Sequence, residues 1–462
     1  MPLERPLFWH QGLFLQPQHF QLTDLHHAAQ VLPFQTYGLP DFWGLVSIQI
    51  QDAALNNKSF EILSGEFLFP DGTHCVFPGT AVIKPRSFDD AWLQGEKPFT
   101  VYLGLRKWDP SGENVAIVGS MDEVINVTTR FATTANPEEV RDLHAGGPIA
   151  QVKRLNLALR IFWENEIGQL DNYYAIPVAQ IERSGEEIHL SRRFVPPCLT
   201  IAASEFLIKV VKDVRDQVTS RCRQLEEYKS PRETTSAQFD IGIVIFLLAL
   251  RSLNRWVPLL CHYAETRHLH PWTVYCALRQ LVGELSTFSE NVNASGERID
   301  GTRVLPPYKH DNLYECFASA LTLIGELMDA ITVSPGHMIR LDFDGKYFAN
   351  EVPEHIFDSR NRFWLVLRTE TQAETVAYAV RRLAKLSAKR NITTLIARAV
   401  PGVPLEHFPI PPAGLPRRAN THYFRIDHTS AQWQEVEANH AVALYWDSAP
   451  KDLGVELAVL RS

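Results

Sequence analysis

The chain has 462 residues and a mass of 52.5 kDa, which predicts about three domains at ~150 residues each. Hydrophobic residues make up 45% and charged residues 21% of the chain, a composition that supports several packed cores and excludes a disordered protein. The 45 Lys and Arg residues against 53 Asp and Glu residues give a net charge of −8. The whole chain therefore lacks the positive field that nucleic acid binding requires, and we expect no nucleic acid partner.

The cysteines and the apolar runs bear on the compartment. The six cysteines are Cys75, Cys198, Cys222, Cys261, Cys276 and Cys316. They form no C-x-x-C pair and are interpreted as core thiols in a reducing compartment. No secretory signal is visible at the N-terminus, and the longest apolar run, residues 241–250, is about half of the ~20 residues that span a bilayer. The sequence predicts a cytoplasmic protein with no direct membrane span.

The first twenty residues crowd apolar side chains into a segment without a regular period. This set consists of Phe8, Trp9, Leu13, Phe14, Leu15 and Phe20. Gly12 and Pro17 interrupt it, and it comes before the first segment with a regular apolar period. Such a segment needs a cover, which is either the first sheet of the same chain or another subunit, where aromatic anchors dominate the binding energy.

Residues 43–194 have the pattern of a β domain. Short β-branched and aromatic stretches alternate with turn sequences such as Pro70-Asp71-Gly72. Examples of predicted strands are residues 46–50, 99–105, 115–118 and 178–181. Some of the stretches are apolar throughout, which indicates that both faces of part of the sheet are covered. We assign residues 1–195 to an N-terminal β-sandwich domain.

Past residue 196 the apolar period changes to three and four residues. Ser204 is a plausible N-cap for a helix of roughly 25 residues. Further helices are predicted at residues 239–260, 271–288 and 311–331, with Pro271 in a first turn. Four helices joined by moderate loops predict a helical bundle domain over residues 196–334, within the chain or between chains.

The remaining residues, 335–462, predict a mixed α/β head domain. Its strands are expected at residues 338–343, 363–367 and 394–397. A capping-box sequence at residues 371–374 predicts a helix that continues to about residue 387. Six prolines between residues 401 and 416 exclude a helix or a central strand there. The predicted fold class is thus multidomain: an N-terminal β-sandwich, a central α-helical bundle and a C-terminal mixed α/β head.

The sequence contains few motifs that are typical of enzymes. Phosphate-binding, dinucleotide-binding, zincin and nucleophile-elbow motifs are all missing from the sequence. The potential metal ligands are Cys261, His262, Glu265, His268 and His270, and, near the N-terminus, His10, His19, His26 and His27. Asp342 and Asp344 resemble the start of an EF-hand loop, but Lys346 and the missing twelfth-position Glu favour a turn. We favour packed or hydrogen-bonded histidines over a metal site, and expect no catalytic residue and no cofactor.

A basic cluster lies in the head domain. Its members are Arg381, Arg382, Lys385, Lys389 and Arg390. Basic residues in the last turns of a helix suit the helix dipole without any further role. On an acidic chain the same cluster is alternatively a surface for an acidic partner.

Several segments resemble one protein family. The sequence from Trp9 to Gln21, WHQGLFLQPQHFQ, resembles the opening motif of the TssK family, the baseplate subunit of bacterial type VI secretion systems. Pro196-Pro197-Cys198-Leu199, His270-Pro271 and the Tyr308–Leu313 segment, YKHDNL, resemble later motifs of that family in the same order. The prolines from Pro401 onward and Tyr423-Phe424 resemble its C-terminal part.

The resemblance implies a structural, non-enzymatic role. It implies a homotrimer that holds the TssF and TssG wedge proteins through its N-terminal domain. The C-terminal domain is implied to reach the cytoplasmic regions of TssL and TssM, so that the protein docks at the cytoplasmic face of the inner membrane. On this basis the expected partner-binding residues are Trp9, His10, Phe14, Pro17, His19, Phe20, Arg381, Arg382 and Lys385.

Two other function classes remain open from the residues alone. One is a carbohydrate-active β-sandwich enzyme that uses a pair of carboxylates. The other is a metal-dependent hydrolase centred on His262, His268 and His270.

Overall fold

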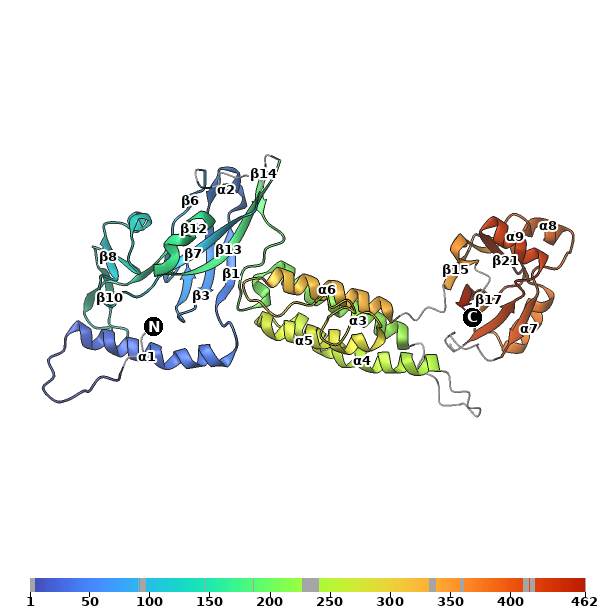
Figure 1. Ribbon diagram of the computed structural model, residues 1–462, viewed down its shortest axis with the longest axis horizontal. Coiled ribbons are helices and arrows are strands. Elements are labelled where there is room, and N and C mark those ends of the chain that lie inside the picture. Colours follow the sequence, from blue (N-terminus) through green and yellow to red (C-terminus); the bar gives the residue numbers. More distant parts are fainter. Residues whose placement is uncertain are drawn as a thin grey trace. The chain divides into compact units, whose positions relative to one another are not determined.

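The computed structural model (Figure 1) describes residues 5–89, 91, 97–144, 146–185, 187–226, 241–331, 338–357, 361–409, 415 and 420–461. The chain divides into two compact units. The first combines Met1–Asp216 with Pro258–Leu327, and the second combines Gln217–Val257 with Met328–Ser462.

The first unit begins with a long helix and contains two main sheets. The helices are α1 (Pro17–Gly38) and α2 (Asp52–Asn56). An antiparallel sheet has the order β1-β3-β4, from Gly44–Ile50, Ile62–Leu68 and His74–Phe77. The larger sheet has the order β14-β13-β7-β12-β9-β8, with β5 beside β12. Its strands in chain order are β5 (Ala81–Ile83), β7 (Phe99–Arg106), β8 (Val115–Val118), β9 (Phe131–Thr134), β12 (Asn156–Trp163), β13 (Tyr173–Ser184) and β14 (Glu187–Leu190).

The four example strands predicted in this region are confirmed, as β1, β7, β8 and part of β13. Two short ribbons complete the region. They pair β2 (Ser59–Phe60) with β6 (Arg86–Ser87) and β10 (Glu138–Arg141) with β11 (Ile149–Val152).

Four longer helices follow, and each predicted helix is confirmed over its described residues, while residues 227–240 lie outside them. They are α3 (Glu205–Glu226), α4 (Ile241–Glu265), α5 (Pro271–Leu285) and α6 (Leu313–Ala330). The apolar stripe of α3 is buried as its period predicts, with Leu207, Val214 and Val218 fully covered. Ring contacts join α3 to α6 through Phe206 and Tyr314, and α5 to α6 through Tyr275 and Phe317.

Helix α4 has an unusual surface. Its segment Val244–Glu265 is, among the described residues, one helix that is long and apolar enough by length and composition to cross a membrane. Core helices of soluble proteins pass the same test, and Arg251 and Arg255 interrupt this one. The absence of a membrane span stays a prediction. Ile245, Leu247 and Leu248 are 42–50% exposed, so part of α4 is left uncovered by the residues that the structure describes.

The head contains an eight-stranded sheet. The strand order is β18-β21-β16-β15-β22-β17-β20-β19, and every pairing in it is antiparallel. The strands are β15 (Met338–Phe343), β16 (Phe348–Glu351), β17 (Asn361–Arg368), β18 (Lys385–Ala388), β19 (Leu405–Phe408), β20 (Thr421–Ile426), β21 (Ala441–Tyr445) and β22 (Gly454–Arg461). The helices are α7 (Ala373–Arg382), α8 (Ile392–Ala397) and α9 (Ala431–Asn439). The predicted strands at 338–343 and 363–367 are confirmed. Between the flanking Pro404 and Pro409, β19 is an edge strand, in line with the exclusion of a central strand, while Pro411, Pro412 and Pro416 lie outside the described residues.

Two head predictions are wrong. The helix predicted to reach residue 387 ends at Arg382, because residues 385–388 form β18, in which Leu386 and Ala388 are buried against β21. Its N-cap is Gln372, which makes no side-chain cap, so the expected capping box is not formed. The strand predicted at 394–397 is instead part of α8. Lys385 Nζ donates to the carbonyl of Leu395 (3.0 Å) in this helix and to that of Val400 (2.7 Å) after it, which satisfies carbonyl groups where the helix ends.

Candidate partner-binding surfaces

The N-terminal aromatic segment is shaped by a turn and a helix cap. The Leu13 N–H donates to the His10 carbonyl at 3.3 Å, and Gly12 takes a φ of +87° between them. A turn with positive φ at that position favours glycine. Pro17 then occupies the first turn of α1, and the Gln16 N–H donates to His19 Nδ1 at 3.0 Å. His19 is thus a capping residue, and its ring lies 6.4 Å from that of Trp9.

The aromatic side chains of this segment point outward. Phe8, Trp9, Phe14, Leu15 and Phe20 are 51–81% exposed. The alternative in which the first sheet covers them is therefore wrong for this chain. Large exposed apolar patches mark interaction sites in soluble proteins, so the structure favours the alternative in which another subunit supplies the cover.

Helix α1 is not predicted from the sequence, which has no regular apolar period in this region. Ala29 is its only buried residue, while Phe34 and Tyr37 are exposed. Apolar side chains therefore do not gather on one face, and no helical period reveals the element. In the sequence, Pro17 at a first-turn position marks the start of this helix. The structure adds the cap from His19.

The internal motif residues meet at one joint of the first unit, between β1 and the helices. The Leu45 N–H donates to the Pro197 carbonyl at 2.9 Å, and Leu199 N–H donates to the Leu45 carbonyl at 2.8 Å. Gly44, with a φ of +120°, leaves room for this approach, because a Cβ there would lie 2.5 Å from the Pro197 oxygen.

Two buried histidines close the joint. The rings of His270 and His310 stack 5.6 Å apart at an angle of 5°. His310 Nε2 donates to the Trp43 carbonyl at 2.8 Å, and His270 Nε2 lies 3.3 Å from the Asp41 carbonyl. Burial, with a further contribution from His310, lowers the pKa of His270 to about 4, and burial also lowers the pKa of His310. Both rings are therefore neutral at pH 7.

The head presents the predicted basic cluster only in part. Arg381 and Arg382 are exposed at the end of α7. Lys385 is half-buried by its two carbonyl partners, and Arg390 pairs with Glu435 at 2.8 Å. The partner-binding roles of Arg381, Arg382 and Lys385 stay predictions.

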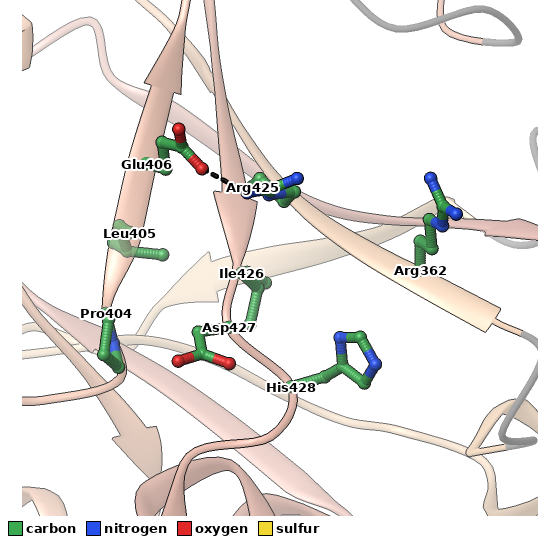
Figure 2. A pocket seen from close by; sticks show the side chains of 8 residues that line it. All are labelled: Arg362, Pro404, Leu405, Glu406, Arg425, Ile426, Asp427 and His428. Atoms are coloured by element: carbon green, nitrogen blue, oxygen red, sulfur yellow. Dashed lines mark hydrogen bonds and ion pairs between the residues drawn. The ribbon is translucent and has the colours of Figure 1, made fainter.

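Near this cluster the head has an open cleft of about 560 Å³. Figure 2 shows its side chains coming from the ends of β17, β19 and β20. Arg362, Arg425 and His428 supply basic groups, and Glu406 forms an ion pair with Arg425. The carboxylate of Asp427 accepts hydrogen bonds from Thr429, which lower its pKa.

The potential metal ligands either make other contacts or are not grouped with further ligands. Among the described residues, no group of three or more His, Cys, Asp or Glu side chains is placed to hold a metal ion. His270 caps α5 by accepting from the Trp272 N–H at 3.2 Å. The Asp344 carboxylate accepts from the backbone of Lys346 and Tyr347 and so forms the expected turn.

Comparisons with known proteins identify the chain's relatives. A family model described as "Bacterial Type VI secretion, VC_A0110, EvfL, ImpJ, VasE" matches residues 19–460. A protein of Pseudomonas aeruginosa, described as type VI secretion system baseplate component TssK1, is 26% identical over 450 residues, which are 95% of this chain and 94% of that protein.

Solved structures share the fold. A crystal structure of TssK is 22% identical, with a TM-score of 0.61 over 99% of this chain and 100% of that chain. A chain of a type VI secretion baseplate complex is 22% identical, with a TM-score of 0.62 over 100% of both chains. A chain of a TssK–TssF–TssG baseplate subcomplex is 24% identical, with a TM-score of 0.59 over 71% of this chain and 100% of that one.

Exposed apolar surfaces on a fold of sheets and long helices are typical of a protein that binds other subunits. The family match specifies the assembly, which is the type VI secretion baseplate. The chain belongs to the TssK family of baseplate components.

Proposed function

We propose that this chain is a non-enzymatic, homotrimeric adaptor that binds the TssF and TssG wedge proteins at one end and the cytoplasmic regions of TssL and TssM at the other. In this proposal residues 1–195 bind the wedge, residues 196–334 join the subunits, and residues 335–462 reach the membrane complex. The protein would then work in the cytoplasm, docked at the inner membrane through that complex.

The observation that carries the proposal is the exposed aromatic segment. Trp9, Phe14 and Phe20 project from a segment whose backbone is held by the Gly12 turn and the His19 cap. A preorganised backbone lowers the entropy cost of binding, and buried aromatic anchors supply most of the energy of an interface. His10 and Pro17 contribute to the same turn and helix start.

The test replaces one anchor. We expect Trp9→Ala to weaken wedge binding by about 2 kcal/mol, or roughly 30-fold, and to leave the fold intact because Trp9 is half-exposed. Titration of the TssF–TssG wedge against the full chain measures the effect. Tyr378→Ala is the matched control, because this head aromatic is 65% exposed and lies outside the segment. Equal wedge affinity in all three proteins would contradict the proposed role of the segment.

A further inference from the structure

The two edges of the head sheet are built differently. At the β18 edge, the Val403 N–H donates to the Leu386 carbonyl at 2.8 Å. Gly402 allows this contact, because a Cβ there would lie 2.6 Å from the Leu386 oxygen. Residues 402–403 therefore cover that edge. At the opposite edge β19 pairs only with β20 in the part of the sheet that the structure describes. Natural sheets usually protect both edges, because an open edge pairs with another chain.

The register tells which backbone groups of β19 face outward. The Asp427 N–H donates to the Pro404 carbonyl at 3.1 Å, in line with the pairs Leu405↔Ile426 and Glu406↔Arg425. Hydrogen-bonded and non-hydrogen-bonded pairs alternate along an antiparallel ladder. Glu406 therefore exchanges its bonds with Arg425, while Leu405 and His407 direct their N–H and C=O groups to the open edge.

Two arginines, a histidine and two carboxylates line the head cleft where β19 begins. Its Arg362 belongs to β17, which β20 separates from β19, and has no ion-pair partner among the described residues. Arg381 of α7 lies close to His407: burial first, and then the charge of Arg381, lowers the pKa of that imidazole. The two nearby carboxylates are already engaged, Glu406 by Arg425 and Asp427 by Thr429.

The charge of the head differs in sign from that of the rest of the chain. Residues 335–462 contain 16 Lys and Arg against 14 Asp and Glu, a net charge of +2. The preceding residues contain 29 against 39, a net charge of −10. A partner that selects the head by charge is therefore acidic.

We propose that the open edge of β19 binds an extended acidic segment of a partner protein, which adds to the sheet as a further strand. Where β19 begins, the same segment continues into the head cleft and sets a carboxylate against Arg362 and His428. Backbone pairing supplies affinity, and the basic side chains supply selectivity. This inference rests on the proposed function only in taking the membrane-complex proteins as the natural source of that segment.

The test removes one outward N–H from the full-length protein. The probes are the cytoplasmic fragments of TssL and TssM and a synthetic peptide of alternating valine and glutamate. His407→Pro deletes the outward N–H without removing a bond to β20, and should weaken binding about tenfold. His407→Ala loses the same imidazole but keeps the N–H, and should bind as the parent does. Equal binding by both variants overturns the proposal.

A second variant covers the case in which His407→Pro disturbs the fold. Arg362→Glu should weaken binding at low salt, and the loss should shrink as salt rises. Arg340→Glu is the control, since Arg340 is an exposed arginine of β15, four strands away from β19. Equal losses from the two charge reversals overturn the proposal.

The remaining outcomes separate the two proposals. If the peptide binds in a His407→Pro-sensitive manner but neither fragment binds, the edge site stands and the membrane-complex role fails. If the fragments bind the parent and His407→Pro equally, the membrane-complex role stands and the edge site fails. If no probe binds, both fail. Amide exchange that is already slow at Leu405 and His407 in the free protein would show that the chain covers its own edge, and would overturn the inference.

Discussion

At the scale of single residues, His270 and His310 show why two motif histidines need not be metal ligands. In the neutral form that carries its hydrogen on Nε2, each ring uses both nitrogens. His270 Nδ1 accepts from the Trp272 N–H, and His310 Nδ1 lies 2.7 Å from the Tyr308 hydroxyl. A second proton on His270 would face a backbone donor and create a cation beside another ring in a buried joint. The pair therefore favours the neutral state.

The pair makes stability depend on pH. The folded pKa of His270 is about 4, below its ordinary value of 6.5. The unfolded chain therefore binds more protons between these values, and stability falls as pH drops from 6.5 toward 4, by about 3 kcal/mol from His270. Urea midpoints measured across this range should fall less steeply for the His270→Gln/His310→Gln double variant. If the urea midpoints of the double variant fall with pH as steeply as those of the parent, the histidine pair does not cause the pH dependence.

A buried ion pair connects the turn between β3 and β4 to the larger sheet. Arg130 donates to Asp71 at 2.8 Å and to the Arg106 carbonyl at 2.6 Å, and both charged side chains are almost fully buried. Arg130→Met leaves the Asp71 charge without its partner and should cost about 3–5 kcal/mol. Urea unfolding measures the loss. Adding Asp71→Asn should recover part of it, and strictly additive losses would show that the two residues do not interact.

At the scale of elements, sequence periodicity predicted the long helices whose apolar stripe is buried by the same chain. The stripes of α3 and α6 are covered by their own chain, so a period of three to four marks them correctly. Helix α1 carries no such stripe, and Ala29 is the one residue of it that is buried. The helix predicted to reach residue 387 and the strand predicted at 394–397 are wrong because tertiary contacts to β21 and Lys385, rather than local preference, set the structure there.

The joint between β1 and the helices shows a second limit of what the sequence predicts. Cys198, His270, Tyr308 and His310 were recognised as motif residues, but nothing in their spacing indicated that they meet. Pairs such as His310 with Trp43 are separated by hundreds of residues, and only the fold brings them together. The aromatic segment, by contrast, was marked as a candidate surface, because its apolar density is local.

Gly402 lets residues 402–403 approach β18 at one edge of the head sheet. Gly402→Val places a side chain where its Cβ would lie 2.6 Å from the Leu386 oxygen, so residues 402–403 must move away from β18. We expect a loss of about 1–3 kcal/mol, measured as a lower melting temperature. Gly454→Ala in the same domain is the control, because its added Cβ meets only Arg368 at an ordinary 3.7 Å. Equal melting temperatures for the two variants would contradict this account.

At the scale of the whole molecule, the exposed face of α4 is the proposed trimer contact. Ile245, Leu247 and Leu248 leave apolar area that a second copy would bury. Leu248→Glu should convert the trimer to a smaller species in sedimentation experiments, because an unpaired charge in an apolar interface costs several kcal/mol. Leu383→Glu changes an equally exposed leucine of the head and should remain trimeric. A trimer that survives Leu248→Glu would place the contact elsewhere.

The central claim is that one chain bridges two assemblies, and a bridging measurement tests it most directly. Immobilised TssF–TssG wedge is loaded with the full-length protein, and the retention of TssL and TssM cytoplasmic fragments is then measured. The account predicts that the wedge retains the fragments only when the protein is present. Trp9→Ala should reduce the amount of protein on the wedge, whereas Arg362→Glu should leave that amount unchanged and reduce the fragments alone. Fragments that displace the protein from the wedge, or that never join it there, would contradict a two-ended adaptor.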